Sequence, residues 1–363
     1  MTQHKLLQNF EIKGYQSALI EWFDDNHRSL PWRENKDPYR VWVSEIMLQQ
    51  TRVDTVIPYY LNFMREFPSL EDLATAEEDR LLKAWEGLGY YSRVRNLQTA
   101  VREVVSEYGG QVPKTRAEIS TLKGIGPYTA GAILSIAYGK PEPAVDGNVM
   151  RVLSRVLLVK EDIAKAKTRK LFEEILYELI PQLDPSAFNQ GLMELGALIC
   201  TPTSPGCLLC PVRTYCRAYH AGQEHNLPIK SKKKKPIEKK MAALVLINKN
   251  GEVLIEKRPE IGLLARLWHF PNIEITQEQS GVEELVSFCK SEYDASVEID
   301  TPIQFVQHVF SHLIWNITVY DVTIENQSIE ETETRKWVSW KQIEQYAFPV
   351  SHQKIIEHCK KEA

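Results

Sequence analysis

The segment LKGIGPYTAGAILSIAYG, residues 122–139, gives the clearest indication of the fold. It begins as a turn built on Gly124 and Gly126 and continues as an apolar helix, with Pro127 where a first helical turn tolerates proline. Glycines beside a helix N-terminus expose backbone N–H groups, which suits the binding of a phosphate. A Gly-x-Gly turn before a helix is also ordinary architecture. Alone, the segment therefore predicts a hairpin and leaves its role open.

An aspartate follows this hairpin in the segment PAVDGN, residues 143–148. Asp146 stands just before a predicted helix, where an aspartate commonly caps the helix N-terminus. Capping and a role in chemistry are both compatible with this position.

Four of the six cysteines fall within ICTPTSPGCLLCPVRTYC, residues 199–216. They are Cys200, Cys207, Cys210 and Cys216, separated by six, two and five residues. Such clustering is typical of a metal site rather than of a disulfide framework. Both tetrahedral zinc and a 4Fe–4S cluster accept four thiolates. One close pair with a distant cysteine on each side favours the cluster, while zinc and free thiols remain alternatives.

The chain has 363 residues, 43% hydrophobic and 25% charged, which predicts two or three globular domains. Forty-four Lys and Arg against forty-eight Asp and Glu give a net charge of −4, which excludes a general polycation. Seven lysines and one glutamate in residues 230–240 predict a solvated linker, which can also approach DNA phosphates. We expect a cytoplasmic protein, nucleoid-associated in a bacterium, because the sequence shows neither a membrane helix nor a signal peptide.

Before the linker the hydrophobic pattern predicts helices, among them Tyr15–Asn26, Arg40–Arg52, Asp79–Glu86 and Thr168–Leu179. After it, AALVLINKNGEVLIEKR predicts two strands around an Asn-Gly turn. LIWNITVYDVTI and RKWVSW predict further strands, and helices are expected near 281–293 and 351–360. An all-helical part is thus followed by an α+β part.

Together these features resemble the endonuclease III superfamily of DNA glycosylases, which combines an LxGIGxxTA hairpin, an aspartate and four cysteines in this order. LPWR (30–33), VWVSEIMLQQTRV (41–53), WEGLGYYSRVRNL (85–97) and AVDGNVMRV (144–152) are similar to its MutY-type adenine glycosylases. The resemblance implies a 4Fe–4S cluster on the four cysteines. It also implies removal of adenine mispaired with 8-oxoguanine or guanine in duplex DNA.

Relatives that nick the strand carry a lysine directly before the Thr-Ala of the hairpin, and here that position is Tyr128. A tyrosine cannot form an imine, so strand cleavage by that route is not expected.

Two carboxyl residues are expected to carry the chemistry. Glu45 shares a predicted helical face with Val41, Trp42 and Leu48, and apolar neighbours favour its acid form. A general acid needs that form, because adenine leaves better once a ring nitrogen is protonated. An ion pair between Glu45 and Arg33 or Arg52 is the alternative. Asp146 is expected to stabilise the sugar cation or to trap it covalently.

The resemblance supplies the remaining site residues. Tyr128 and Asn148 are expected to orient water or Asp146. The pocket for the extruded adenine is expected to include Trp32, Arg33, Leu48, Val53 and Gln190. Expected contacts with DNA and the lesion are Gln50, Thr51, Leu88, Tyr90, Gly124, Gly126, His308, Phe310, Ser311 and His312. Leu48 and Val53 are also ordinary core residues, and Gly87-Leu88-Gly89 is also a candidate tight turn.

Residues 241–363 resemble a Nudix-type fold. GVEELVSFCKSEYDASV, 281–297, stands where the hydrolases carry their metal-binding Arg-Glu-x-x-Glu-Glu string and lacks it. We therefore expect a module that recognises the 8-oxoguanine strand through the loop QHVFSHL, residues 307–313.

The fold class expected is multidomain, with an all-α helix-hairpin-helix glycosylase core, an iron–sulfur cluster domain and a C-terminal α+β Nudix-like domain. Residues 30–138 are predicted to form the six-helix domain, and 1–29 with 139–228 the cluster domain. Residues 229–240 are then the linker, and 241–363 the Nudix-like domain. We expect a monomer without a membrane partner. Three other functions compete: a pyrimidine glycosylase with lyase activity, a non-catalytic iron–sulfur regulator, and a nucleotide pyrophosphatase.

Overall fold

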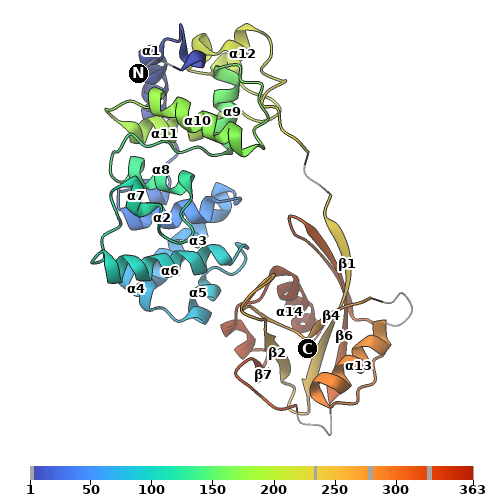
Figure 1. Cartoon of the computed structure of the whole chain (residues 1–363). Helices are drawn as coiled ribbons and strands as arrows, with labels where there is room; N and C mark the ends of the chain where they lie inside the picture. The colour runs from blue at the N-terminus through green and yellow to red at the C-terminus, as the bar shows by residue number, and fades with distance from the viewer. Residues whose placement is uncertain (1–3, 233–234, 277–280, 325–328, 363) are drawn as a thin grey trace. The chain divides into compact units, whose positions relative to one another are not determined.

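The computed structural model describes residues 4–232, 235–276, 281–324 and 329–362, and the chain folds into two compact units. Unit 1 comprises Met1–Thr75 and Arg95–Lys232 (Figure 1). Unit 2 comprises Ala76–Val94 and Lys233–Ala363. Two residues of the predicted linker, 233 and 234, lie outside the described residues.

Unit 1 is built from helices, as the sequence predicted. Helix α6, Ser92–Glu107, begins at the unit boundary, and the other α-helices of unit 1 are α1 (Ile12–Asn26), α2 (Pro38–Leu48), α3 (Val53–Glu66), α4 (Leu70–Thr75), α7 (Arg116–Ile119), α8 (Pro127–Ile136), α9 (Gly147–Val156), α10 (Ala166–Leu179), α11 (Pro185–Leu198) and α12 (Arg217–His220). Single 3₁₀ turns are η1 (Lys5–Leu7), η2 (Pro31–Arg33), η3 (Cys207–Leu209) and η4 (Arg213–Tyr215). In Figure 1, α1 and α9–α12 form one group and α2–α4 with α6–α8 another.

The hairpin segment forms as predicted. Gly126 is the N-cap of α8 and Pro127 follows in the first turn. Gly124 has φ +83°, a left-handed backbone that glycine adopts without strain. Gly131 lies so close to the Pro143 carbonyl that an added Cβ would come within 1.8 Å of its oxygen. Because glycine has no Cβ, α8 can pack directly against the segment that leads into Asp146.

Helix α2 is shorter than predicted. The pattern predicted a helix over Arg40–Arg52, but α2 spans Pro38–Leu48 and α3 begins at Val53. Gln50 has φ +61°, which an α-helix does not allow, so the chain turns here. Leu48 and Val53 therefore lie at the ends of two different helices.

One apolar core of unit 1 joins α1, α9, α10 and α11 to the cysteine segment. Tyr15, Leu153, Phe172 and Phe188 are fully buried there, and Cys216 belongs to the same cluster. The cysteine segment is thereby fixed against the helix that follows Asp146.

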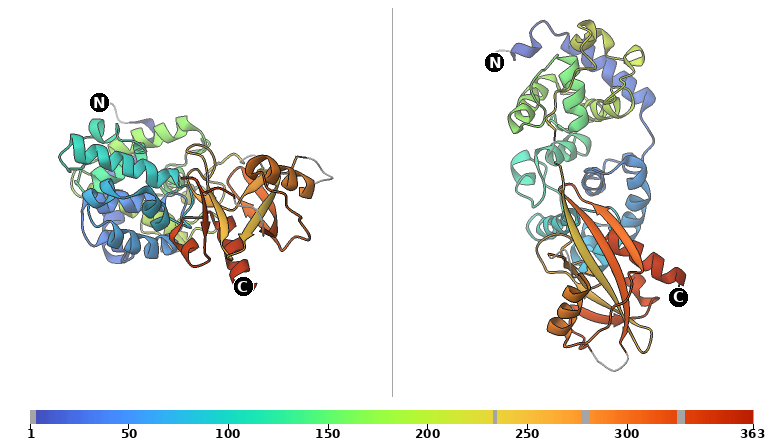
Figure 2. Two further views of the ribbon diagram at one scale, coloured as in Figure 1. Left: turned by 90° about the horizontal axis from the view of Figure 1, so that it is seen from below. Right: turned by 90° about the vertical axis from the view of Figure 1, so that its right-hand side faces the viewer.

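Unit 2 contains α5 (Glu78–Ala84) and a seven-stranded sheet with α13 (Gly281–Tyr293), η5 (Gln342–Gln345) and α14 (Val350–Glu362). The strands are β1 (Ile237–Asn248), β2 (Val253–Lys257), β3 (Trp268–His269), β4 (Asn272–Glu274), β5 (Gln304–Val309), β6 (Leu313–Ile324) and β7 (Arg335–Val338). Their order is β3-β2-β1-β6-β5, with β4 on β1 and β7 on β2. The long strands β1, β6 and β5 lie side by side in Figure 2, and β1 and β6 run parallel.

The two faces of the sheet bury alternate residues of β1, as the period of two requires. Ala243 and Val245 pack with Phe348 and Ile355 on the side of α14. Leu244 and Leu246 pack with α13 on the other face. The predicted α+β architecture is confirmed, including the bounds of β6 and α13. In the described residues, no helix is long and apolar enough to cross a membrane.

Candidate active site

A pocket of about 170 Å³ lies in unit 1 and collects most of the residues expected around the reacting base. Of the predicted catalytic and base-binding residues, those that line it are Trp32, Arg33, Glu45, Leu48, Val53, Tyr128, Asp146, Asn148 and Gln190. Thr51, expected among the DNA contacts, lines it as well. Elements far apart in the sequence, η2, α2, α8, α9 and α11, thus contribute to one pocket.

Glu45 is a buried carboxyl on α2, with 5% of its surface exposed. Burial raises its pKa to about 7, and the nearby charge of Asp146 acts in the same direction. The Tyr128 hydroxyl donates a hydrogen bond to Glu45 Oε2 over 2.5 Å, which opposes this rise. No ion pair of Glu45 is present in the described structure, so the alternative pairing with Arg33 or Arg52 is wrong. Glu45 can therefore hold or give up a proton near neutral pH.

Asp146 does cap a helix, but only one of its oxygens is used for that. Oδ1 accepts the Val149 N–H of α9 over 2.7 Å, while Oδ2 accepts from Asn148 Nδ2 over 2.9 Å. Burial raises the Asp146 pKa, whereas these donors act to lower it. The carboxylate is thus fixed at the pocket wall by donors that favour its ionised form.

A hydrogen-bonded chain runs from Asp146 to the cysteine segment. Asn148 Oδ1 accepts from Arg151 Nη2 over 2.8 Å, and Arg151 Nε donates to the Cys200 carbonyl over 2.8 Å. The orientation of Asp146 therefore depends on the conformation of the backbone at Cys200.

Glu194 on α11 is a site residue that the sequence interpretation missed. Its carboxylate, 2% exposed, accepts from both Arg28 and Arg33, and Arg33 Nε donates to Gln190 Oε1 over 3.1 Å. Burial acts to raise the Glu194 pKa, but the arginine hydrogen bonds outweigh it and hold that pKa at about 2. The four-residue spacing from Gln190, which places both on one helical face, was the available signal.

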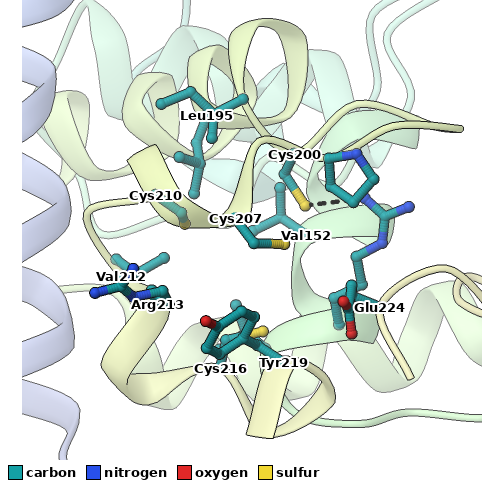
Figure 3. Close-up of a pocket in the computed structure, with 14 residues that line it drawn as sticks. Val152, Leu195, Cys200, Cys207, Cys210, Val212, Arg213, Cys216, Tyr219 and Glu224 are labelled. Carbon is teal, nitrogen blue, oxygen red and sulfur yellow. Dashed lines mark hydrogen bonds between the residues drawn. The ribbon is translucent and has the colours of Figure 1, made fainter. Parts of the chain in front are cut away.

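The four clustered cysteines line a common pocket with apolar side chains from α9 and α11 (Figure 3). Burial raises the pKa of the Cys210 thiol to about 12 and that of Cys216 to about 11. Within the described parts of the chain, no three His, Cys, Asp or Glu side chains are grouped around a single ion position. The pocket nevertheless offers four cysteine sulfurs as possible metal ligands.

The other predicted DNA contacts of unit 1 lie at turns. Gln50, between α2 and α3, has a left-handed backbone, which is uncommon outside glycine and often marks functional positions. Around Gly126 no atom lies within 4 Å of an added Cβ, so the N-terminus of α8 is open.

Leu88 and Tyr90 belong to unit 2 and differ in exposure. Leu88 is only 7% exposed and lies between Gly87 and Gly89, which both have positive φ. It is a packed residue of a tight turn, as the alternative interpretation of Gly87-Leu88-Gly89 expected, and its contact with DNA stays a prediction. Tyr90 is 46% exposed with φ +48°, and the Arg93 guanidinium lies over its ring.

The predicted lesion-recognition residues occupy the end of β5 and its turn into β6. Ser311 and His312 are exposed and hydrogen-bonded to each other. Phe310 is half-buried, in edge contact with His308 and Trp315. Ser311 and His312 are thus the polar groups that this turn offers.

Two family models match the chain. Residues 43–178 match the HhH-GPD superfamily of base excision DNA repair proteins, and residues 242–358 match the NUDIX domain. These matches agree with the helical and α+β parts of the structure.

Curated relatives match nearly the whole chain. The adenine DNA glycosylase of Rattus norvegicus is 35% identical over 95% of this chain and 78% of its own length. That of Buchnera aphidicola subsp. Schizaphis graminum is 35% identical over 95% of this chain and 99% of its own.

Solved structures show the fold of the helical part. A thermostable thymine-DNA glycosylase is 30% identical, with a TM-score of 0.54 over 59% of this chain and 99% of its own. A trapped endonuclease III–DNA covalent intermediate, 24% identical, has a TM-score of 0.51 over 61% of this chain and 99% of its own. The curated relatives and the HhH-GPD match show that the chain belongs to the adenine DNA glycosylase family, enzymes that remove adenine from DNA in base excision repair.

Proposed function

We propose that this enzyme removes adenine opposite 8-oxoguanine or guanine in duplex DNA, by hydrolysis and without cutting the strand. The observation that supports it best is the pair of carboxyl residues, Glu45 and Asp146, in one pocket. Burial raises the pKa of both carboxyls, but their hydrogen-bond donors differ: two or more N–H groups favour the ionised form of Asp146, whereas Glu45, whose pKa rises to about 7, accepts from the Tyr128 hydroxyl. A pair tuned in this way supplies an acid and an anion to one reaction.

The base must leave the duplex before these groups can act on it. The pocket is small, as suits a single base, and Trp32, Leu48 and Val53 give it apolar walls. Arg33 and Gln190 supply donors and an acceptor for the edge of the base. Because Gln190 Oε1 accepts from Arg33 and its Nε2 donates to Ser186, the orientation of its amide is fixed.

Glu45 gives its proton to a ring nitrogen of adenine as the glycosidic bond breaks, which makes the base a neutral leaving group. Asp146, held by Asn148 and the Val149 N–H, lies beside the sugar cation and stabilises it, either as an ion pair or as a covalent partner. Water then adds to the sugar carbon that held the base, and the proton that the water loses restores the acid form of Glu45.

Tyr128 stands where a strand-cleaving enzyme has its lysine, and its hydroxyl is already engaged with Glu45. Since a phenol forms no imine with the sugar, the product is an intact strand with an abasic site.

Backbone N–H groups at Gly124–Tyr128 are the proposed contacts to a DNA phosphate, since α8 presents an open N-terminus there. Gln50, Thr51 and Tyr90 are proposed to contact the DNA near the lesion. In unit 2, Ser311 and His312 are proposed to hydrogen-bond the oxidised base, with His308 and Phe310 supporting the turn.

Cys200, Cys207, Cys210 and Cys216 fit a 4Fe–4S cluster, because all four line one mostly apolar pocket. In such a cluster each thiolate binds a different iron, so the sulfurs need not converge on one ion. When bound, the cluster supplies a rigid anchor for the segment that these cysteines span.

The proposal is tested with Glu45→Gln and Asp146→Asn, and with Glu174→Gln as a control on the exposed side of α10. We expect both site variants to lose at least about a hundredfold in single-turnover excision while still binding the mispair. The control should retain wild-type excision. Full activity in Asp146→Asn, or wild-type activity equal on adenine opposite thymine and opposite 8-oxoguanine, would overturn the proposal.

A further inference from the structure

Arg155 on α9 is one of the largest fully buried side chains, with 1% of its surface exposed. All three of its guanidinium nitrogens donate hydrogen bonds. Nε donates to the Leu227 carbonyl over 2.9 Å, and Nη2 donates to the Pro202 carbonyl over 3.0 Å. Nη1 donates to the Thr201 carbonyl over 2.7 Å and to Cys200 Sγ over 3.2 Å.

These contacts join both ends of the cysteine segment. Thr201 and Pro202 follow the first cysteine, whereas Leu227 comes after the last. One side chain therefore closes the loop of residues 200–227 at its base and also reaches a sulfur atom. The neighbouring Arg151 contacts the Cys200 carbonyl but donates to no sulfur.

The charge of Arg155 has no carboxylate partner in the described residues. Glu224 lines the same pocket, yet its ion pair is with His225, at 3.7 Å, and not with Arg155. A buried guanidinium without a counter-ion is costly, and carbonyl oxygens satisfy its hydrogen bonds without neutralising its charge. Besides the Glu224 carboxylate, to which Arg155 makes no hydrogen bond or ion pair in the described residues, the pocket groups that can carry negative charge are the cysteine sulfurs in their metal-bound form. Arg155 donates directly to one of these sulfurs, that of Cys200.

We propose that Arg155 is the counter-charge of the cysteine-bound cluster and a hydrogen-bond donor to its Cys200 sulfur, and so controls how tightly the cluster is held and how easily it is reduced. This inference rests on the cluster assigned under the proposed function. Arg155 is a positioning residue, because it acts on a cluster ligand rather than on DNA.

Two physical consequences follow for the cluster. A partner that orients and neutralises a metal ligand commonly accounts for about ten- to hundredfold in metal affinity. A positive charge and a donor at the sulfur also stabilise the reduced cluster, so removing them lowers the reduction potential.

The test uses the full-length holoprotein and the variants Arg155→Gln and Arg155→Lys. Arg213→Gln is the matched control, since Arg213 lines the pocket but donates to a carbonyl, that of Leu208, and to no sulfur. Three quantities are measured: iron and sulfide content, the rate of iron release to a chelator without oxygen, and the reduction potential by voltammetry. Circular dichroism checks that each variant is folded.

We expect Arg155→Gln to release iron about ten- to hundredfold faster than wild type and to have a lower potential. Arg155→Lys keeps the positive charge but not the planar guanidinium, so its rate of iron release and its reduction potential should lie between those of wild type and Arg155→Gln. Arg213→Gln should match wild type. If Arg155→Gln is insoluble, the proposal is tested on folded Arg155→Lys, by its rate of iron release and its reduction potential.

A folded Arg155 variant with the wild-type rate of iron release and the wild-type reduction potential would overturn the proposal. Arg155 would then only stabilise the loop through its hydrogen bonds to carbonyl groups. Wild-type protein without iron and sulfide would refute the cluster and this inference together. Adenine excision, measured on the same preparation, would show separately whether the proposed reaction stands.

Discussion

The Tyr128 hydroxyl donates a hydrogen bond to Glu45 Oε2 over 2.5 Å, joining α8 to α2 across 83 positions of the chain. The bond places a neutral donor on the carboxyl that is proposed to protonate adenine. Tyr128 is also the residue at the position where the resemblance expects a lysine in strand-cleaving relatives. Tyr128 thus bears on two parts of the proposed function, acid catalysis by Glu45 and the lack of strand cleavage.

The pH dependence of excision should report the protonation of Glu45. With a pKa of about 7, the acid form is lost as the pH rises, so the single-turnover rate should fall about tenfold per pH unit above that value. At acid pH the rate should fall again as Asp146, whose pKa is also raised, takes up a proton. A rate that increases steadily from pH 6 to pH 9 would be incompatible with Glu45 as the acid.

Replacing Tyr128 by Phe should move the alkaline limb of this profile to higher pH. The phenol stabilises the ionised carboxylate and so lowers the Glu45 pKa, and its removal leaves the effect of burial opposed only by the charge of Arg33. Measuring the rate against pH for both proteins tests this. A limb that stays in place, or moves to lower pH, would show that the hydrogen bond does not act on Glu45.

Glu45→Gln should make the stability of the protein less dependent on pH. The folded-state pKa of Glu45 is raised above its ordinary value of 4.5, so its contribution is complete below pH 4.5 and is lost as the pH rises through 7. Relative to wild type, the variant should therefore gain about 3 kcal/mol between pH 4.5 and pH 8. Urea denaturation at both pH values measures the gain, with Glu174→Gln as a control that should show none.

Glu194→Gln should impair excision through Arg33 and Gln190. Removing one partner of a buried ion pair leaves two arginines uncompensated and should cost about 3 kcal/mol of stability. We expect slower excision with nearly unchanged affinity for mispaired DNA, because the pocket rather than the DNA-binding surface is disturbed. Single-turnover rates and binding isotherms separate these effects. A wild-type rate in this variant would remove Glu194 from the site.

Local patterns in the sequence were sufficient for many elements and insufficient for others. Local sequence patterns predicted the strand β6 and the helix α13 with their observed bounds. The prediction of α2 ran four residues too far, because the left-handed backbone at Gln50 has no signal in the hydrophobic pattern.

Contacts between distant segments could not be predicted from such patterns. The residues expected around the base do meet in one pocket, but that expectation came from the resemblance to a family. The pairing of Tyr128 with Glu45, the two arginines on Glu194 and the reach of Arg155 to Cys200 all depend on tertiary packing. Spacing along one helix, as for Gln190 and Glu194, is the exception that could have been noticed.

The central claim is tested most directly by single-turnover reaction of the holoprotein with a duplex that contains one adenine opposite 8-oxoguanine, analysed with and without alkali. Glu45 acid catalysis with Tyr128 in place of a lysine predicts strand breaks at the adenine position only after alkali. Breaks without alkali, or no breaks under either condition from folded protein, would contradict it.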